Sequence, residues 1–428
     1  MSRLRIALGE RRLLLFSASG ISGNPLCHAN SLVPSAYARP GLFVSIGKLP
    51  FRHILPAWLL SRALLLTIIV FSHSTALNTI PAREERNLHP ELRLSLNNAR
   101  EAMRCVFSSA DASWYFGIAE QGYDPGPFTR SEPKNWTFFP LFPFSISVLN
   151  IVIGSSVVSG LLFANLSFLL SLFVLHAIGR KQNLEPHSLS LLPWLVCFFP
   201  TSYFFSAPLT ESLFLLCTSL AWYSVFSGRI LSAGLLMALA SATRPTGLLV
   251  LPAFFYLLWQ QRSLLSPRGV LAAGIAPSGA ALYMWYLYRL TGEPLAFAKN
   301  QFAWNRGEID FFTFLANTTG DLLHVLEPWN PIWLNLAAVI LAFTAGFAFA
   351  FRKEFGLALF LLVPIGTALL TGTALSAARF VGGLFPVYFY LLSISKTEIS
   401  ERIMLGVFVS LFSIFSLMYA LHVTAAMT

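Results

Sequence analysis

Long apolar runs recur along almost the whole chain, and they constrain its fold more than any other feature of the sequence. From about residue 54 onward the runs measure roughly 17 to 25 residues, the length at which a helix crosses a ~30 Å hydrocarbon layer. Hydrophobic residues make up 55% of the chain and charged residues 11%, too few to give a soluble globule a charged surface. The sequence therefore predicts an all-α polytopic membrane protein with about eleven transmembrane helices.

Polar or proline-containing connections separate the expected spans. The segment 137–153 is not counted as a span, because it is short and opens with Pro140 and Pro143, which suit a helix start better than mid-membrane helix. We expect it to be an interfacial helix on the outer side. The expected spans cover approximately residues 54–77, 156–179, 188–207, 210–227, 230–244, 246–260, 269–289, 331–351, 355–375, 379–394 and 403–424.

The placement of charge predicts the orientation in the membrane. The net charge is +10, and much of the excess lies in the N-terminal segment and in short connections such as Arg180–Lys181 and Arg352–Lys353. Cytoplasmic loops carry the excess of Lys and Arg, so we place these connections and the N-terminus inside. Thirteen of the nineteen acidic residues fall in two longer loops, 78–136 and 291–328, which this assignment places outside. The positive charge is thus explained by topology and does not indicate nucleic-acid binding.

These assignments give a simple domain organisation. Residues 1–53 form a basic cytoplasmic N-terminal segment without the pattern of a signal peptide, and either a cytoplasmic extension or a misassigned start is consistent with it. Residues 54–428 form the transmembrane domain, in which 78–155 is a large first extracytoplasmic loop of interfacial helices and 291–330 is the second extracytoplasmic loop. We expect an apolar helical face within the first loop to lie on the membrane. That face consists of Leu92, Leu96, Ala99, Met103 and Phe107.

Asp111 is the leading candidate for chemistry in the first loop. It precedes an apolar pattern that contains Trp114, Tyr115 and Ile118, so it should lie at the N-terminus of a helix. One interpretation is a helix N-cap, and the other is a general base. The two are compatible, because a cap also keeps a carboxylate ionised and fixed in direction.

Further charged residues gather at the outer ends of the spans. Glu211 follows Pro208 and is interpreted as a first-turn or N-cap acid, or as a functional group within the membrane. Arg244, Arg289 and Arg379 run against the charge rule that governs the other loops. Their side chains either extend to the membrane–water interface or bind phosphate, since a guanidinium can donate to two phosphate oxygens at once.

Cysteine and histidine spacing indicates no metal site. The four cysteines form no Cys-x-x-Cys motif, and the eight histidines are scattered. We therefore expect neither a disulfide framework nor a bound metal.

Four blocks of the sequence follow one another in order: Asp111-Ala-x-Trp-Tyr-x-x-Ile-Ala-x-x-Gly-Tyr with Phe139-Pro-Leu-Phe-Pro143, Phe199-Pro-Thr-Ser with Thr210-Glu-Ser212, Ala242-Thr-Arg-Pro-Thr-Gly247, and Arg379-Phe380 with Phe385-Pro386. Together they resemble the PIG-V-type mannosyltransferases and their bacterial relatives, which belong to the GT-C glycosyltransferase superfamily. The resemblance spans roughly residues 54–395. In one departure, Ala110 stands where the family commonly has Trp before the aspartate.

The resemblance implies an inverting transfer of mannose from a polyprenyl-phosphate donor to a hydroxyl of a glycolipid or protein acceptor. It implies an extracytoplasmic site, no nucleotide donor, no required metal and no other cofactor. We expect Asp111 to be the base and Glu211 to orient the acceptor or hold an arginine. Arg244 and Arg379 would stabilise the departing phosphate. Trp114, Tyr115 and Tyr123 would contact the sugar, or belong to an interfacial aromatic belt.

Two other functions fit the same residues. One is a transporter or flippase of a lipid-linked or anionic solute, although we find no paired interruptions in two halves of the chain. The other is a different transferase or ligase of lipid-linked sugars. The motif details favour a bacterial cytoplasmic membrane over the endoplasmic reticulum, and the second outer loop either covers the site or lies on the membrane.

Overall fold

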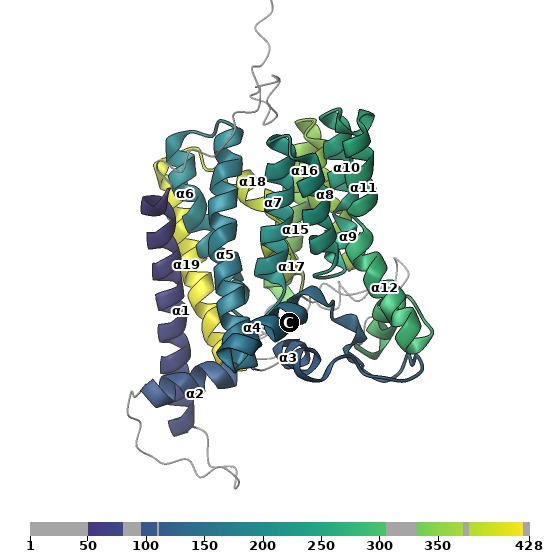
Figure 1. Ribbon diagram of the computed structural model, residues 1–428. Helices are drawn as coiled ribbons and strands as arrows, with labels where there is room; N and C mark the ends of the chain where they lie inside the picture. Colours follow the sequence, from purple (N-terminus) through teal and green to yellow (C-terminus); the bar gives the residue numbers. More distant parts are fainter. Residues whose placement is uncertain (1–49, 80–95, 109–110, 305–331, 371–375, 423–428) are drawn as a thin grey trace, which may run out of the picture. The chain divides into compact units, whose positions relative to one another are not determined.

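The computed structural model describes residues 50–79, 96–108, 111–304, 332–370 and 376–422, and within these ranges it contains helices and no strands (Figure 1). The N-terminal half contains α1 (Phe51–Thr79), α2 (Leu96–Phe107), α3 (Asp111–Gln121), η1 (Asn135–Thr137), α4 (Leu141–Ile153), α5 (Ser156–Lys181), α6 (Pro186–Cys197), η2 (Ser202–Phe205) and α7 (Glu211–Phe226). The remaining helices are α8 (Ile230–Ser241), α9 (Thr246–Leu249), α10 (Leu251–Gln260), η3 (Ser263–Leu265), α11 (Pro267–Ile275), α12 (Ser278–Thr291), α13 (Ala296–Lys299), η4 (Asn300–Trp304), α15 (Ile332–Phe351), α16 (Phe355–Leu369), α17 (Ala377–Gly382), α18 (Pro386–Ile394) and α19 (Glu398–Ala420).

The helices have the lengths and composition of membrane spans. Five stretches of the described chain are long and apolar enough to cross a bilayer: Phe51–His73, Ser156–Lys181, Pro267–Thr291, Trp333–Phe351 and Glu398–Ala420. Shorter apolar helices accompany them, among them Glu211–Phe226 and Phe355–Leu369. The predicted all-α membrane fold is confirmed at this level, while the number of eleven spans stays a prediction.

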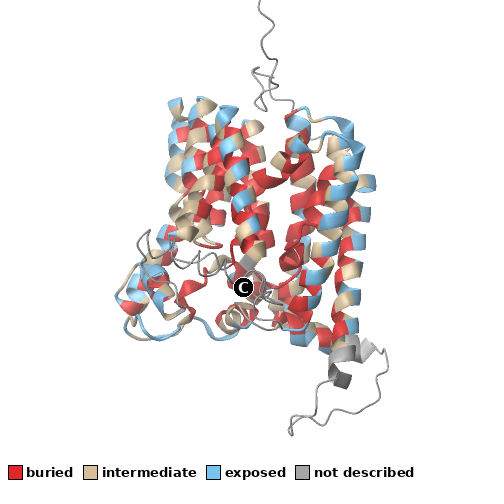
Figure 2. Ribbon diagram, turned by 180° about the vertical axis from the view of Figure 1, so that it is seen from behind, coloured by how far each residue is buried: buried red, intermediate tan, exposed pale blue. Residues whose placement is uncertain are grey.

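Exposed and half-buried residues lie on the outer faces of the helices, whereas buried residues gather between the helices (Figure 2). Many of the exposed residues are large and apolar. Leu60 and Phe71 of α1 are more than half exposed, and so are Leu162 and Leu166 of α5. A soluble monomer rarely exposes an apolar surface of this extent. Lipid therefore covers these faces of an integral membrane protein.

Several expected spans are broken rather than continuous. Residues 188–207 were expected to be one helix, but α6 ends at Cys197 and η2 follows after a turn. The expected span 379–394 is divided into α17 and α18, with Pro386 at the start of α18. Proline removes a backbone donor and clashes with the preceding turn, which explains why helices begin again at such positions. The breaks bring irregular backbone to the end of the bundle where the candidate site lies.

Arg62 stabilises the break between α6 and α7. The side chain is 6% exposed, and it donates to the carbonyl oxygens of Cys197 and Ser202. Its other hydrogen bonds reach the hydroxyls of Ser61, Ser202 and Ser206. A guanidinium has five N–H donors, and these five bonds match that number. Buried backbone carbonyls without a helix partner need such donors.

Helices α2, α3 and α4 of the predicted first outer loop, residues 78–155, lie together across one end of the bundle (Figure 1). Ala102, Val106 and Phe107 of α2 are buried, and the Phe107 ring lies 6.2 Å from that of Tyr419 in α19. Of the predicted membrane-facing residues, Phe107 thus packs against the protein and Met103 is half-buried, while the side chains of Leu92, Leu96 and Ala99 lie outside the described part. The membrane-facing role of this helix stays a prediction. Of the N-terminal segment 1–53 only the last residues are described, and of the second outer loop only the part up to Trp304.

Candidate active site

Four charged residues that the sequence singled out meet in one ionic network. Nη1 of Arg379 lies 2.5 Å from Oδ2 of Asp111, and Nε of the same arginine lies 2.5 Å from Oε1 of Glu211. Nη1 of Arg244 donates to the same Glu211 oxygen at 3.0 Å. The order in space is therefore Asp111, Arg379, Glu211, Arg244, from four segments that are far apart in the chain.

The network is buried at one end and accessible at the other. The side chain of Glu211 is 1% exposed, that of Arg379 6% and that of Arg244 8%, whereas that of Asp111 is 36% exposed. Two carboxylates and two guanidinium groups balance each other, as buried charges require. Oε2 of Glu211 is buried without a hydrogen-bond partner among the described residues. Glu211 thus lies behind the two arginines and holds both, which is one of the two roles expected for it.

Helix starts place the two acids. Helix α3 begins at Asp111, and the residue before it lies outside the described part, so the capping interpretation is not tested. Helix α7 begins at Glu211, and the side chain of Thr210 makes no capping bond there. Glu211 is therefore a first-turn acid, with its charge near the positive end of the helix.

The segment between α8 and α9 places Arg244. The N–H of Leu141 donates to the carbonyl of Ala242 at 3.0 Å, which joins this segment to the start of α4 in the first outer loop. A Cβ atom on Gly247 would lie 2.1 Å from the carbonyl oxygen of Ala240, so only glycine allows the close approach at this position. The guanidinium of Arg244 lies over the ring of Phe380, 5.0 Å from its centroid.

Hydrogen bonds on both sides hold the short helix α17 that carries Arg379. The N–H of Ala378 donates to Oδ1 of Asn335, and the hydroxyl of Thr201 donates to the carbonyl of Ala378. The hydroxyl of Tyr388 donates to the carbonyl of Gly382 at 2.6 Å. Ser376, just before the helix, has a φ of 65°, a conformation that a non-glycine residue adopts only when its surroundings impose it.

Asp111, Arg244 and Arg379 line one cavity with a volume of about 970 Å³. Its walls come from α3, the first outer loop, the α8–α9 segment, the end of α16, the start of α17 and the second outer loop. Pro364, Leu248 and Phe297 give it apolar surface, and Thr137, Thr210 and Thr246 add polar groups. A largely apolar cavity with a few convergent charged groups has the character of a small-molecule or lipid-headgroup site.

Comparisons with known proteins give a family similarity for part of the chain. The sequence profile of mannosyltransferase (PIG-V) matches residues 53–262. Human GPI alpha-1,6-mannosyltransferase 2 is 32% identical over 148 residues, which cover 32% of this chain and 29% of the human protein. Residues 53–262, just under half of the chain, are therefore similar to the PIG-V mannosyltransferase family. No solved structure matches the chain significantly.

The PIG-V match contains most of the candidate network but not all of it. Asp111, Glu211 and Arg244 lie within the matched range, and Arg379 lies beyond it. The chain matches less than a third of the human protein's length. The structure, and not the family match, shows the contacts of Arg379 with Asp111 and Glu211. These contacts join the block around Arg379 to the matched part of the chain.

The three aromatic candidates divide into one residue at the cavity and two behind it. Tyr115 lines the cavity. Burial, followed by the neighbouring Asp111 carboxylate, raises the pKa of its phenol, which therefore stays neutral. The Trp114 ring stacks on Phe138 at 5.7 Å, and the Tyr123 hydroxyl donates to the carbonyl of Phe138 at 2.7 Å. Neither Trp114 nor Tyr123 is among the residues that line the cavity; Trp114 supports the ring and Tyr123 the backbone of Phe138, which does line it.

Sequence reasoning missed two cationic residues of the cavity, Arg130 and Lys299. Both lie in outer loops, where a charged residue is usually interpreted as solvated surface. Leu295, Phe297 and Phe302 also line the cavity, so the described part of the second outer loop covers the site. The rest of that loop, with the aromatic residues Phe311, Phe312 and Trp329, lies outside the described residues.

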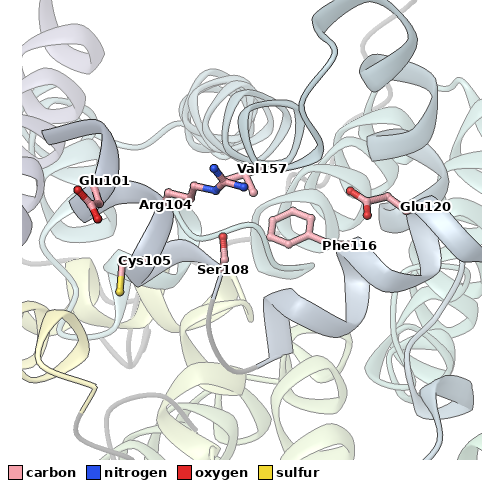
Figure 3. Close-up of a pocket in the computed structure, with 7 residues that line it drawn as sticks. All are labelled: Glu101, Arg104, Cys105, Ser108, Phe116, Glu120 and Val157. Atoms are coloured by element: carbon pink, nitrogen blue, oxygen red, sulfur yellow. The ribbon is translucent and has the colours of Figure 1, made fainter. Parts of the chain in front are cut away.

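A second cavity, of about 430 Å³, lies between α2, α3 and α5 (Figure 3). Its lining includes Glu101, Arg104, Phe116 and Glu120, and Figure 3 shows the Arg104 side chain between the two glutamates. None of the residues of the ionic network lines it. The larger cavity is therefore the candidate active site.

Proposed function

We propose that this protein is an inverting glycosyltransferase that moves mannose from a polyprenyl-phosphate donor to an acceptor hydroxyl on the extracytoplasmic face. The observation that carries the proposal is the contact of Arg379 with both Asp111 and Glu211 at the wall of the larger cavity. The PIG-V match supports the choice of mannose, since the family and the human relative are named mannosyltransferases.

Asp111 suits the role of general base. Nη1 of Arg379 contacts its Oδ2, and this contact fixes the direction of the carboxylate at the cavity wall. The side chain is 36% exposed, and it lines the cavity. In the proposed complex the second carboxylate oxygen accepts the proton of the acceptor hydroxyl.

Arg244 suits the phosphate of the donor better than Arg379 does. Nε and Nη1 of Arg379 are engaged with Glu211 and Asp111, whereas Arg244 uses one nitrogen, Nη1, in its contact with Glu211. The remaining donors of Arg244 have no hydrogen-bond partner in the described part of the chain, and the residue lines the cavity. A guanidinium with free donors binds phosphate oxygens in a fork.

The proposed step is a single displacement at the anomeric carbon. The acceptor oxygen forms a bond to this carbon on one face while the bond to the phosphate oxygen breaks on the other, which inverts the configuration. The proton of the acceptor hydroxyl moves to Asp111, and polyprenyl phosphate departs with the electron pair of the broken bond. Arg244 meets the charge that develops on the phosphate, the role that a metal ion has in other transferases, so the proposal needs no metal.

Transfer of radiolabelled mannose from purified polyprenyl-phosphate mannose to membrane acceptors tests the proposal. We expect the wild type to transfer and Asp111→Asn to lose at least about a hundredfold in rate, because general base catalysis contributes ~10²–10⁴. Glu120→Gln is the matched control, since this exposed acid lies on the same helix but away from the larger cavity. We also expect the product to have the opposite anomeric configuration to the donor.

Three outcomes would contradict parts of the proposal. Equal rates for the wild type and Asp111→Asn would reduce Asp111 to a structural role. Retention of configuration would exclude the single displacement. If the wild type moved the intact donor across vesicle membranes without transferring mannose, the protein would be a transporter.

A further inference from the structure

The charges that line the larger cavity are balanced except for one. Asp111 pairs with Arg379, and Arg244 pairs with Glu211. Nζ of Lys299 lies 2.5 Å from a carboxylate oxygen of Glu293, and the hydrogen bond from Lys299 lowers the pKa of that carboxyl. Arg130 forms no ion pair with any residue that the structure describes. Among the described residues that line the cavity, Arg130 of the first outer loop therefore has the one positive charge without an ionic partner.

The uncompensated guanidinium is held in position at the cavity wall. It lies over the ring of Phe302, 4.6 Å from the centroid, and Phe302 lines the same cavity. Such a stack leaves the N–H donors in the plane of the guanidinium free to bind another group. Arg130 is thus oriented without losing its capacity to bind an anion.

The backbone that carries Arg130 is also fixed. Asn300 is fully buried, and its amide nitrogen donates to the carbonyls of Thr129 and Glu132 on either side of Arg130. Its amide oxygen accepts from the N–H of Lys134 at 3.1 Å. One asparagine of the second outer loop thus determines the path of the first loop at this point, which places Arg130 over Phe302.

The cavity has room for two polar headgroups. Its volume of about 970 Å³ is at the upper end of the ~300–1,000 Å³ range for ligand sites. The ionic network occupies the wall formed by α3, α7, α17 and the α8–α9 segment, while Arg130 belongs to the wall formed by the two outer loops. A reaction between two lipid-borne substrates needs two such binding places beside one base.

We propose that Arg130 is a second phosphate-binding residue, which holds a phosphate ester of the acceptor lipid while Arg244 holds the phosphate of the donor. The proposal rests on the proposed glycosyl transfer for the terms donor and acceptor. The proposal requires two separate phosphate sites in one cavity. Binding to these sites can be measured without any transfer of mannose.

Binding of two lipid probes to the purified protein in neutral detergent tests the proposal. The probes are polyprenyl phosphate and dioctanoyl phosphatidic acid, with uncharged dioctanoylglycerol as the control ligand. We expect both phosphate probes to bind together without competition. Arg130→Gln should weaken the binding of phosphatidic acid at least tenfold and leave that of polyprenyl phosphate unchanged, and Arg244→Gln should do the reverse.

Two further variants distinguish a specific phosphate site from general electrostatic attraction between the protein and an anionic lipid. Arg289→Gln removes an exposed arginine near the same loops that does not line the cavity, and it should leave both affinities unchanged. Arg130→Lys keeps the charge without the planar fork and should bind phosphatidic acid with intermediate affinity. Thermal unfolding at the wild-type temperature would show that each variant is folded.

The proposal is overturned if the two phosphate probes compete for one place, or if Arg130→Gln weakens polyprenyl phosphate instead. It is also overturned if Arg289→Gln weakens phosphatidic acid as much as Arg130→Gln does. A failure of mannose transfer alone would contradict the proposed function and leave these binding results standing.

Discussion

Arg244 and Arg379 both contact Oε1 of Glu211, but they differ in the contacts that their other nitrogens make. A second nitrogen of Arg379 contacts Asp111, so this guanidinium links the buried Glu211 to the accessible Asp111. Arg244 makes the single contact and keeps its other donors at the cavity. In the proposed reaction, Arg379 is therefore a positioning residue for the base, and Arg244 binds the donor.

Lysine substitutions separate these two tasks. In Arg379→Lys one ammonium replaces a fork that reaches two carboxylates, so Asp111 loses its orientation and we expect kcat to fall about a hundredfold with a smaller change in the donor KM. In Arg244→Lys we expect the donor KM to rise about tenfold, since one bidentate phosphate contact becomes a point charge. Steady-state transfer kinetics with purified variants measure both effects. A rise in donor KM for Arg379→Lys alone would contradict the assignment.

The sequence predicted the members of the network better than their contacts. Asp111, Glu211, Arg244 and Arg379 stood out because a charge at an outer helix end breaks the pattern of its surroundings. The pairing of acids with arginines depends on how segments far apart in the chain pack together. A local sequence pattern contains no information about that packing. Arg130 carried no such signal, because a charge in a polar loop is ordinary.

Helix breaks are the elements that position the site. Glu211 follows Pro208, and Arg244 precedes Pro245 between α8 and α9. Arg379 lies in a helix of six residues that is bounded by turns. The sequence predicted span ends beside Glu211, Arg244 and Arg379, but it treated 188–207 and 379–394 as continuous spans, because hydropathy reports burial in lipid and is insensitive to a local turn. The proline positions were the physical signal for the breaks.

Gly247 tests the close packing behind Arg244. In Gly247→Ala the new Cβ would lie 2.1 Å from the carbonyl oxygen of Ala240, so backbone must shift, and overpacking of this kind costs about 1–3 kcal/mol. We expect a lower unfolding temperature and a raised donor KM, measured in detergent by a thermal-shift assay and by transfer kinetics. Gly406→Ala in α19 is the control, because nothing lies within 4 Å of its added Cβ. Equal unfolding temperatures for both variants would show that the break is not tightly packed.

The whole molecule assembles one site from both outer loops and several helix ends. Phe128 of the first loop donates its N–H to the carbonyl of Thr291, and Asn300 binds the same loop further on. The charge distribution predicts that all these parts lie on the extracytoplasmic side, where a polyprenyl-phosphate donor without a nucleotide would meet them. The orientation is therefore the assumption on which the proposed reaction depends most.

Labelling of single cysteines with a membrane-impermeant maleimide in intact cells tests the orientation. Cys105 is exposed on α2 in the first outer loop, whereas Cys197 and Cys217 are buried. In a Cys27→Ser background we expect Cys105 to be labelled from outside. With Cys105→Ser added as well, Arg180→Cys, at the exposed end of α5, should react only after the cells are permeabilised. The reverse pattern would place the cavity on the cytoplasmic side, because α2, α3 and α4 lie at the same end of the bundle, and a donor would then have to be presented from within the cell.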